Sequence, residues 1–90
     1  MPRLDDVFAA LSDPTRRELV RSLAAGREVT ASGLAGELPM TRQAVAKHLA
    51  VLDRAGLVAS ERRGRETLYR LAPDPLAEAE RWLQETGAAW

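Results

Sequence analysis

Residues 37–58 read ELPMTRQAVAKHLAVLDRAGLV, and this stretch decides the fold. The pattern predicts a short apolar helix that ends at Leu38, a brief break, and a second helix from Thr41 to Ala55. Gly56 follows as the expected left-handed residue at the end of this helix. Polar and basic side chains are concentrated in the first two turns of the second helix. A helix-turn-helix presents its recognition helix to the major groove of DNA in this way.

The predicted recognition helix has an apolar side and a polar side. Val45, Leu49 and Leu52 recur at helical spacing and are expected in the core. A solvated amphipathic helix, in which arginine and glutamine only keep the surface polar, would give the same pattern. The positions that point away from the core are Gln43, Lys47, Ala50 and Arg54.

Six positions of this helix are candidate DNA contacts: Thr41, Arg42, Gln43, Ala44, Ala46 and Lys47. Proteins of this type contact bases with the N-terminal part of the helix. The guanidinium of Arg42 can bridge guanine O6 and N7, and the amide of Gln43 can bridge adenine N6 and N7. The two alanines allow close approach, and their methyl groups suit the thymine methyl. Lys47 suits a phosphate or a guanine, and Thr41 can cap the helix and also reach a phosphate.

His48, the single histidine, lies at the edge of the apolar side of this helix. It is a further candidate DNA contact, through a phosphate. A partly buried histidine that packs or bonds to the backbone explains the same position. Metal binding is not expected there, because the chain offers no second good nitrogen or sulfur ligand.

Hydrophobic periodicity divides the rest of the chain into helices and two strands. Asp13-Pro14 and Asp74-Pro75 each combine an N-cap residue with a proline at the first helical position. The expected helices span about 3–12, 14–25, 30–38, 41–55 and 74–86, and the expected strands about 57–62 and 66–71. This order predicts a mainly α, single domain over residues 1–90: a winged helix-turn-helix with a two-stranded β-hairpin wing (about 57–71) and flanking N- and C-terminal helices.

The tip of the expected wing carries Arg62, Arg63 and Arg65 around Gly64. Gly64 suits the turn, because a positive φ costs glycine little. Three arginines at a hairpin tip can reach a minor groove or its flanking phosphates, so all three are candidate DNA contacts. A charged tip that only keeps an edge strand soluble is the alternative interpretation.

The 90-residue chain has no net charge, but its charges are unevenly distributed. Residues 41–65 hold six basic and two acidic side chains, a net charge of +4, which leaves −4 on the rest. DNA responds to the local patch more than to the total. The low total charge also fits a winged-helix protein-interaction module without specific DNA binding, and this alternative stays open.

Composition argues against several other classes of protein. The chain has no cysteine, so a thiolate metal site or a disulfide is not expected. No segment approaches the roughly 18 apolar residues of a membrane span. Paired carboxylates, a glycine-rich phosphate loop and a nucleophile–base arrangement are not recognisable in the sequence. We therefore expect a cytoplasmic protein that is not an enzyme, needs no cofactor and has double-stranded DNA, not a membrane, as its partner.

The chain resembles the ArsR/SmtB family of bacterial transcriptional repressors over most of its length. The blocks that carry the resemblance are 11–19 (LSDPTRREL), 41–49 (TRQAVAKHL), 51–52, 55–58, Gly64 and 69–71. The resemblance implies a homodimeric, autoregulatory repressor that reads an inverted-repeat operator. It leaves open the operator sequence, the regulated genes, the inducer and the sign of regulation.

Dimerisation through the first and last helices is also implied by the resemblance. The apolar stripes of these helices are surplus in so small a chain, although they could simply close the core of the monomer. The candidate dimer-interface residues are Leu4, Val7, Phe8, Leu11, Leu76, Ala79, Trp82 and Leu83.

Metal sensing does not carry over from the family. Metal-sensing members use a cysteine pair in the third helix, or His, Asp and Glu ligands in the last helix. Here residues 30–38 contain no thiol and residues 74–86 contain no histidine. Carboxylates alone bind transition metals poorly. The sequence therefore resembles the non-metal-sensing branch of the family.

Overall fold

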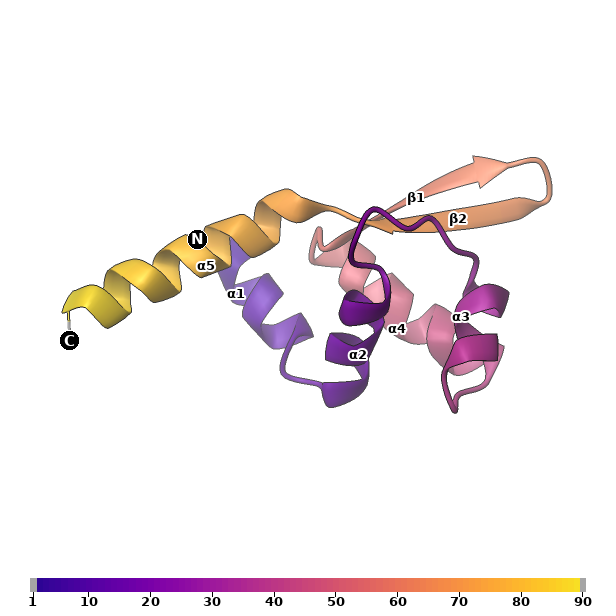
Figure 1. Ribbon diagram of the computed structural model, residues 1–90, viewed down its shortest axis with the longest axis horizontal. Coiled ribbons are helices and arrows are strands. Elements are labelled where there is room, and N and C mark those ends of the chain that lie inside the picture. The colour runs from indigo at the N-terminus through magenta and orange to yellow at the C-terminus, as the bar shows by residue number, and fades with distance from the viewer. Residues whose placement is uncertain (1, 90) are drawn as a thin grey trace.

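Helices form most of the molecule, and a two-stranded hairpin extends from one end of it (Figure 1). The structure, a computed structural model, describes residues 2–89. The extended helix α5 and the hairpin point in opposite directions, which gives principal dimensions of 47 × 25 × 23 Å. The elements are α1 (Pro2–Ala10), α2 (Pro14–Ser22), α3 (Ala31–Glu37), α4 (Arg42–Arg54), β1 (Val58–Arg63), β2 (Glu66–Leu71) and α5 (Pro73–Ala89). The predicted mainly α winged helix-turn-helix is confirmed.

Helix α4 begins and ends where its flanking residues satisfy the free backbone groups. The hydroxyl of Thr41 accepts a hydrogen bond from the Ala44 N–H at 3.1 Å. At the other end Gly56 has a φ of 79°, and the Leu57 N–H donates to the Leu52 carbonyl at 2.9 Å. This bond and the left-handed glycine form a Schellman-type end, which turns the chain sharply toward β1.

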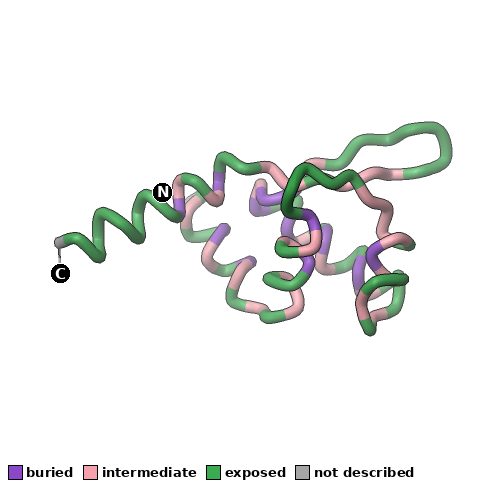
Figure 2. Tube along the Cα trace, in the orientation of Figure 1, coloured by how far each residue is buried: buried purple, intermediate pink, exposed green. Residues whose placement is uncertain are grey.

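The core lies where α4 crosses α2 and α3, and the buried segments of Figure 2 gather there. Val45, Leu49 and Leu52 have no exposed surface, as expected from their spacing. They pack with equally buried leucines, of which Leu19 lies on α2 and Leu34 on α3. Each fully buried leucine contributes about 1.5–3 kcal/mol of transfer free energy. The core therefore fixes the orientation of α4.

Helix α2 starts as predicted but ends earlier. The Asp13 carboxylate accepts hydrogen bonds from the Thr15 N–H at 2.7 Å and the Arg16 N–H at 3.3 Å. Partial desolvation opposes ionisation, yet these bonds and the charges of Arg16 and His48 lower the pKa of the Asp13 carboxyl below its usual value. The helix ends at Ser22 and not near Ala25. Ala25 itself has a left-handed φ of 67°, which a helix cannot contain.

The two terminal helices also differ from their expected bounds. Helix α1 ends at Ala10, and the Ser12 hydroxyl donates to the Ala9 carbonyl at 2.6 Å in the turn that follows. Helix α5 begins at Pro73, one residue before the Asp74 that was expected to cap it. Pro75 then falls in the first turn, where a missing N–H leaves no helical bond unmade.

The wing pairs β1 with β2 in antiparallel register, with Val58 opposite Leu71 and Arg63 opposite Glu66. Gly64 in the turn has a φ of 61°, as the sequence predicts. An unexpected backbone bridge joins this hairpin to the segment before α3. The Val29 N–H donates to the Tyr69 carbonyl at 3.0 Å, and the Tyr69 N–H donates to the Val29 carbonyl at 2.8 Å. The wing is therefore joined to the helix-turn-helix at two places: by the chain between α4 and β1, and by this bridge.

Candidate nucleic-acid interface

The polar side of α4 is open to solvent along its N-terminal half. Arg42, Gln43, Ala46 and Lys47 are exposed, while Ala44 is half-buried. Within residues 2–89 no carboxylate lies in ion-pair distance of Arg42 or Lys47. Both cations are therefore available to an external anion.

Four of the predicted contact residues, Arg42 and Ala46 of α4 and Arg62 and Arg65 of the wing, come together at one cleft. A cleft of about 290 Å³ lies between the start of α3, helix α4 and the wing. The three arginines line it together with hydroxyl side chains and one carboxylate, that of Glu66. Guanidinium and hydroxyl groups are the usual hydrogen-bond donors to phosphate oxygens. The hydroxyl-bearing residues of the cleft are Thr30, Ser32, Thr67 and Tyr69.

Arg63 lies apart from this cleft and is already paired. Its guanidinium lies 2.7 Å from a carboxylate oxygen of Glu61 and 3.2 Å from one of Glu28. The hydrogen bond to Glu61 and the two nearby carboxylates raise the pKa of Arg63 above its ordinary value. A DNA phosphate would have to compete with these carboxylates for Arg63.

Thr41 is exposed, as the arginines are, but its hydroxyl is engaged at the start of α4. The Thr41 hydroxyl already accepts the Ala44 N–H, although its own hydrogen remains free to donate. His48 is half-buried and lines a groove with Arg16 and Lys47. The groove lies on the flank of α4 that faces α2, away from the wing. The choice between packing and phosphate contact for His48 stays a prediction.

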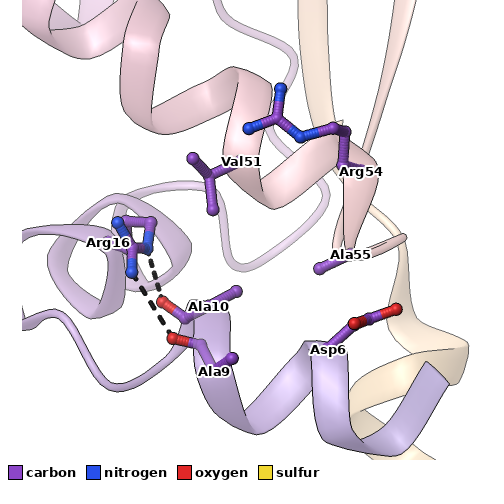
Figure 3. Close-up of a pocket in the computed structure, with 7 residues that line it drawn as sticks. All are labelled: Asp6, Ala9, Ala10, Arg16, Val51, Arg54 and Ala55. Atoms are coloured by element: carbon purple, nitrogen blue, oxygen red, sulfur yellow. Dashed lines mark hydrogen bonds between the residues drawn. The ribbon is translucent and has the colours of Figure 1, made fainter. Parts of the chain in front are cut away.

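Arg16 and Arg17, in the first turn of α2, both bind the end of α1. The Arg16 Nε donates to the Ala10 carbonyl at 2.6 Å, and its Nη2 donates to the Ala9 carbonyl at 3.4 Å (Figure 3). Arg17 donates to the Leu11 carbonyl at 2.7 Å. Cations at a helix C-terminus satisfy its free carbonyl groups and complement its dipole. The signal in the sequence was two arginines soon after a helix end.

The terminal apolar stripes divide into a buried part and an exposed part. Val7 is 1% exposed and Ala79 is 5% exposed, so both belong to the core of the single chain and offer little surface to a partner. Trp82 and Leu83 are 45% and 55% exposed. The Trp82 ring meets Phe8 edge to face at a centroid distance of 5.5 Å. Of the remaining stripe residues, Leu4, Phe8, Leu11 and Leu76 are half-buried.

Residues 2–89 were expected to hold neither a metal ion nor a membrane-spanning helix. They contain no group of three His, Asp or Glu side chains arranged to hold a metal ion. None of their helices combines the length and apolar character needed to cross a membrane.

Comparison with known proteins identifies relatives over most of the chain. Residues 11–61 match the model of a helix-turn-helix domain. The HTH-type transcriptional regulator YuzN of Bacillus subtilis is 41% identical, over 80% of this chain and 85% of its own length. The transcriptional repressor SdpR of Bacillus subtilis is 30% identical, over 89% of this chain and 88% of its own length.

Solved structures give the same result. An ArsR-like transcriptional regulator from Rhodococcus sp. RHA1 has a TM-score of 0.86 and 46% identity, over 99% of this chain and 83% of that one. The homodimeric winged helix-turn-helix DNA-binding domain of Mb0332 from Mycobacterium bovis, a possible ArsR-family regulator, has a TM-score of 0.77 and 25% identity. It covers 97% of this chain and 80% of its own.

Proposed function

Because the chain belongs to the ArsR family of winged helix-turn-helix transcriptional regulators, we propose that it is a homodimeric repressor of transcription in the cytoplasm. It binds an operator through α4 and the wing. The observation that carries this proposal is the cleft in which Arg42 of the recognition helix meets Arg62 and Arg65 of the wing. A DNA backbone that borders the major groove would place phosphates at Arg62 and Arg65 while Arg42 and the start of α4 lie in the groove.

The roles of the contacting residues are assigned from their positions on α4 and on the wing. Arg42 and Gln43, in the first turn of α4, read base edges, and the small side chains Ala44 and Ala46 allow the helix to approach. The remaining positions serve the DNA backbone: Thr41, Lys47, His48, Arg62, Arg63 and Arg65. Backbone contacts set affinity and register, and base contacts set sequence preference.

Selection of bound duplexes from a random pool, followed by titration at several salt concentrations, tests DNA binding. We expect an imperfect inverted repeat with half-sites about one helical turn apart. The logarithm of the affinity should fall linearly with the logarithm of the salt concentration, and the slope should be about −0.9 for each phosphate contacted. A protein that enriches no sequence and shows no salt dependence would instead be a protein-interaction module.

The proposed dimer uses the exposed end of the terminal stripes. Trp82 and Leu83 expose large apolar surface in the single chain, and the similar domain of Mb0332 is homodimeric. Sedimentation should give about twice the 9.9 kDa of one chain. Trp82→Glu should lower the dimer fraction, because it buries an unpaired charge. Gln84→Glu adds the same charge two residues along the helix and should leave the dimer intact, and a wild-type monomer at high concentration would contradict the proposal.

We also propose that the protein is autoregulatory and belongs to the non-metal-sensing branch. The chain has no cysteine and one histidine, so the soft ligands of transition-metal sensors are missing. Zinc, cadmium and arsenite should not change operator affinity at stoichiometric levels. Calorimetry on metal-free protein tests this, and a tight site for one metal ion per chain would contradict it.

A further inference from the structure

A groove follows the flank of α4 that lies away from the wing. It consists of two adjoining hollows of about 430 Å³ and 530 Å³, which share Arg16, Val51 and Arg54. The first hollow lies between α1, α2 and α4 and is drawn in Figure 3. The second continues along α4 past Lys47 and His48. Both volumes fall within the range of small-molecule sites, about 300–1,000 Å³.

The lining of this groove combines an apolar floor with a cationic rim. Methyl groups form the floor, and the residues that supply them are Ala9, Ala10, Ala44, Ala50, Val51 and Ala55. Arg16, Lys47 and Arg54 lie at the rim, and Figure 3 shows the Arg54 side chain extending toward Val51. Asp6, at the α1 end, is the one acidic residue that lines the hollows.

Arg16 is held in place before any ligand arrives. Its bonds to the Ala9 and Ala10 carbonyls and its 3.6 Å contact with Asp13 orient the guanidinium, and its side chain is only 17% exposed. In contrast, no carboxylate among the described residues pairs with Lys47 or Arg54. These two cations are therefore the ones that can bind an anionic group.

The two depressions beside α4 have different chemistry. Three arginines and four hydroxyl groups, with the single carboxylate of Glu66, line the wing cleft, which suits a phosphodiester that needs many hydrogen-bond donors. The floor of the groove offers almost no hydrogen-bond donors, so it suits an apolar group, whereas the cations at its rim suit a negative charge. A molecule with an apolar body and one anionic end satisfies both the floor and the rim.

We propose that this groove binds a small amphipathic organic anion, an aryl or alkyl carboxylate, as the effector of the protein. The carboxylate lies at Lys47 and Arg54, and the apolar body lies on Val51 and Ala9. Lys47 and Arg54 also belong to the exposed side of α4, so the bound anion neutralises charge that DNA needs and displaces the operator. The proposed binding site depends only on the groove, whereas the displacement of operator DNA also depends on the proposed function.

Binding can be measured without DNA by using 1-naphthoate as the probe and 1-naphthalenemethanol as a neutral control of similar size. Methyl signals of Val51 and Ala44 should move in NMR spectra on titration with naphthoate. The alcohol should bind at least about tenfold more weakly, because it cannot pair with the cations. Shifts confined to Leu76 and Leu83, or equal affinity for the alcohol, would overturn the proposed site.

Ala9→Leu tests the floor, because Ala9 is exposed on α1 and contacts DNA in no part of the proposal. The larger side chain fills the hollow and should weaken naphthoate at least about fivefold, with operator affinity unchanged. Ala24→Leu is the matched control, since Ala24 is exposed in the turn after α2, outside the groove. Equal naphthoate affinity in the two variants would overturn the assignment of the floor.

The regulatory part is tested by operator titrations in the presence of naphthoate. A competitive ligand at ten times its dissociation constant lowers the apparent DNA affinity of the wild type about tenfold. Ala9→Leu should resist this effect at the same concentration. If naphthoate binds in the groove without changing DNA affinity, the proposed effector role is overturned, whereas the proposed binding site is supported. If the ligand-free wild-type protein binds no DNA, the proposed function is overturned instead.

Discussion

Helix α4 and the wing both present arginines to the same cleft, yet they are held in place in different ways. The helix rests on Val45, Leu49 and Leu52, none of which has exposed surface. In the wing, residues 60–66 are all exposed; backbone hydrogen bonds tie its base to the rest of the chain, and its tip is linked to the loop before α3 by the exposed Arg63–Glu28 ion pair. Helix orientation therefore depends on the global fold, whereas the wing tip can adjust locally at little cost.

The largest expected effect is on the free energy of unfolding, which should fall more when the support of α4 is weakened than when the wing is weakened. Leu49→Ala leaves a cavity in the core and should lower the free energy of unfolding by about 2–5 kcal/mol. Leu68→Ala, at a half-buried position in the wing, should lower it by about 1 kcal/mol. Urea unfolding followed by circular dichroism measures both. Equal losses would mean that the wing is as firmly supported as the helix.

Base reading by α4 gives the next largest effect. Arg42→Ala or Gln43→Ala should weaken operator binding by about 1–3 kcal/mol and relax discrimination at one base position. The measurement is a set of titrations against operators that carry single base changes. Unchanged operator preference in both variants would show that α4 is not the reading element.

The wing arginines should contribute affinity without sequence preference. Arg62→Ala or Arg65→Ala should weaken binding to operator and to scrambled DNA alike, and reduce the salt slope by about one unit for each lost phosphate contact. Lys47→Ala should behave in the same way. Operator and scrambled duplexes titrated at three salt concentrations distinguish this class from the base-reading class. A wing variant that changes base preference would reverse the division of roles.

The smallest effect concerns the paired arginine of the wing. Glu28→Gln removes one of the two carboxylates beside Arg63 and should raise affinity for scrambled DNA by about twofold to fivefold, because exposed ion pairs are weak and phosphate can replace them. Glu37→Gln is the control: Glu37 pairs with Arg27 at 2.6 Å and does not contact the wing. An equal gain in both variants would indicate a general charge effect and no specific restraint on Arg63.

Local sequence signals predicted the helix-turn-helix well, because its ends are set by neighbouring residues. Thr41 and Gly56 act through bonds within a few positions, and the spacing of Val45, Leu49 and Leu52 defines one buried side. The bounds of α2 and α5 were less accurate. At these ends several residues compete to stop or start a helix, and propensity alone does not decide between them.

The parts that sequence did not predict depend on contacts between distant segments. The Val29–Tyr69 bridge joins residues forty positions apart, and the two carboxylates beside Arg63 include Glu28 from another loop. The meeting of Arg42 with the wing arginines follows from the same long-range packing. Residue type identified these arginines as candidates, but only the fold separates Arg63 from Arg62 and Arg65.

The bridge between Val29 and Tyr69 limits where the chain can change length. Val29 directly precedes Thr30, the N-cap of α3, whose hydroxyl accepts the Gly33 N–H at 3.0 Å. A residue inserted between Val29 and Thr30 would have to break either the bridge or the cap. Insertions among the exposed residues 24–26 change only a solvent-exposed turn. Length variation among functional homologues should therefore occur in that turn and not at the junction before α3.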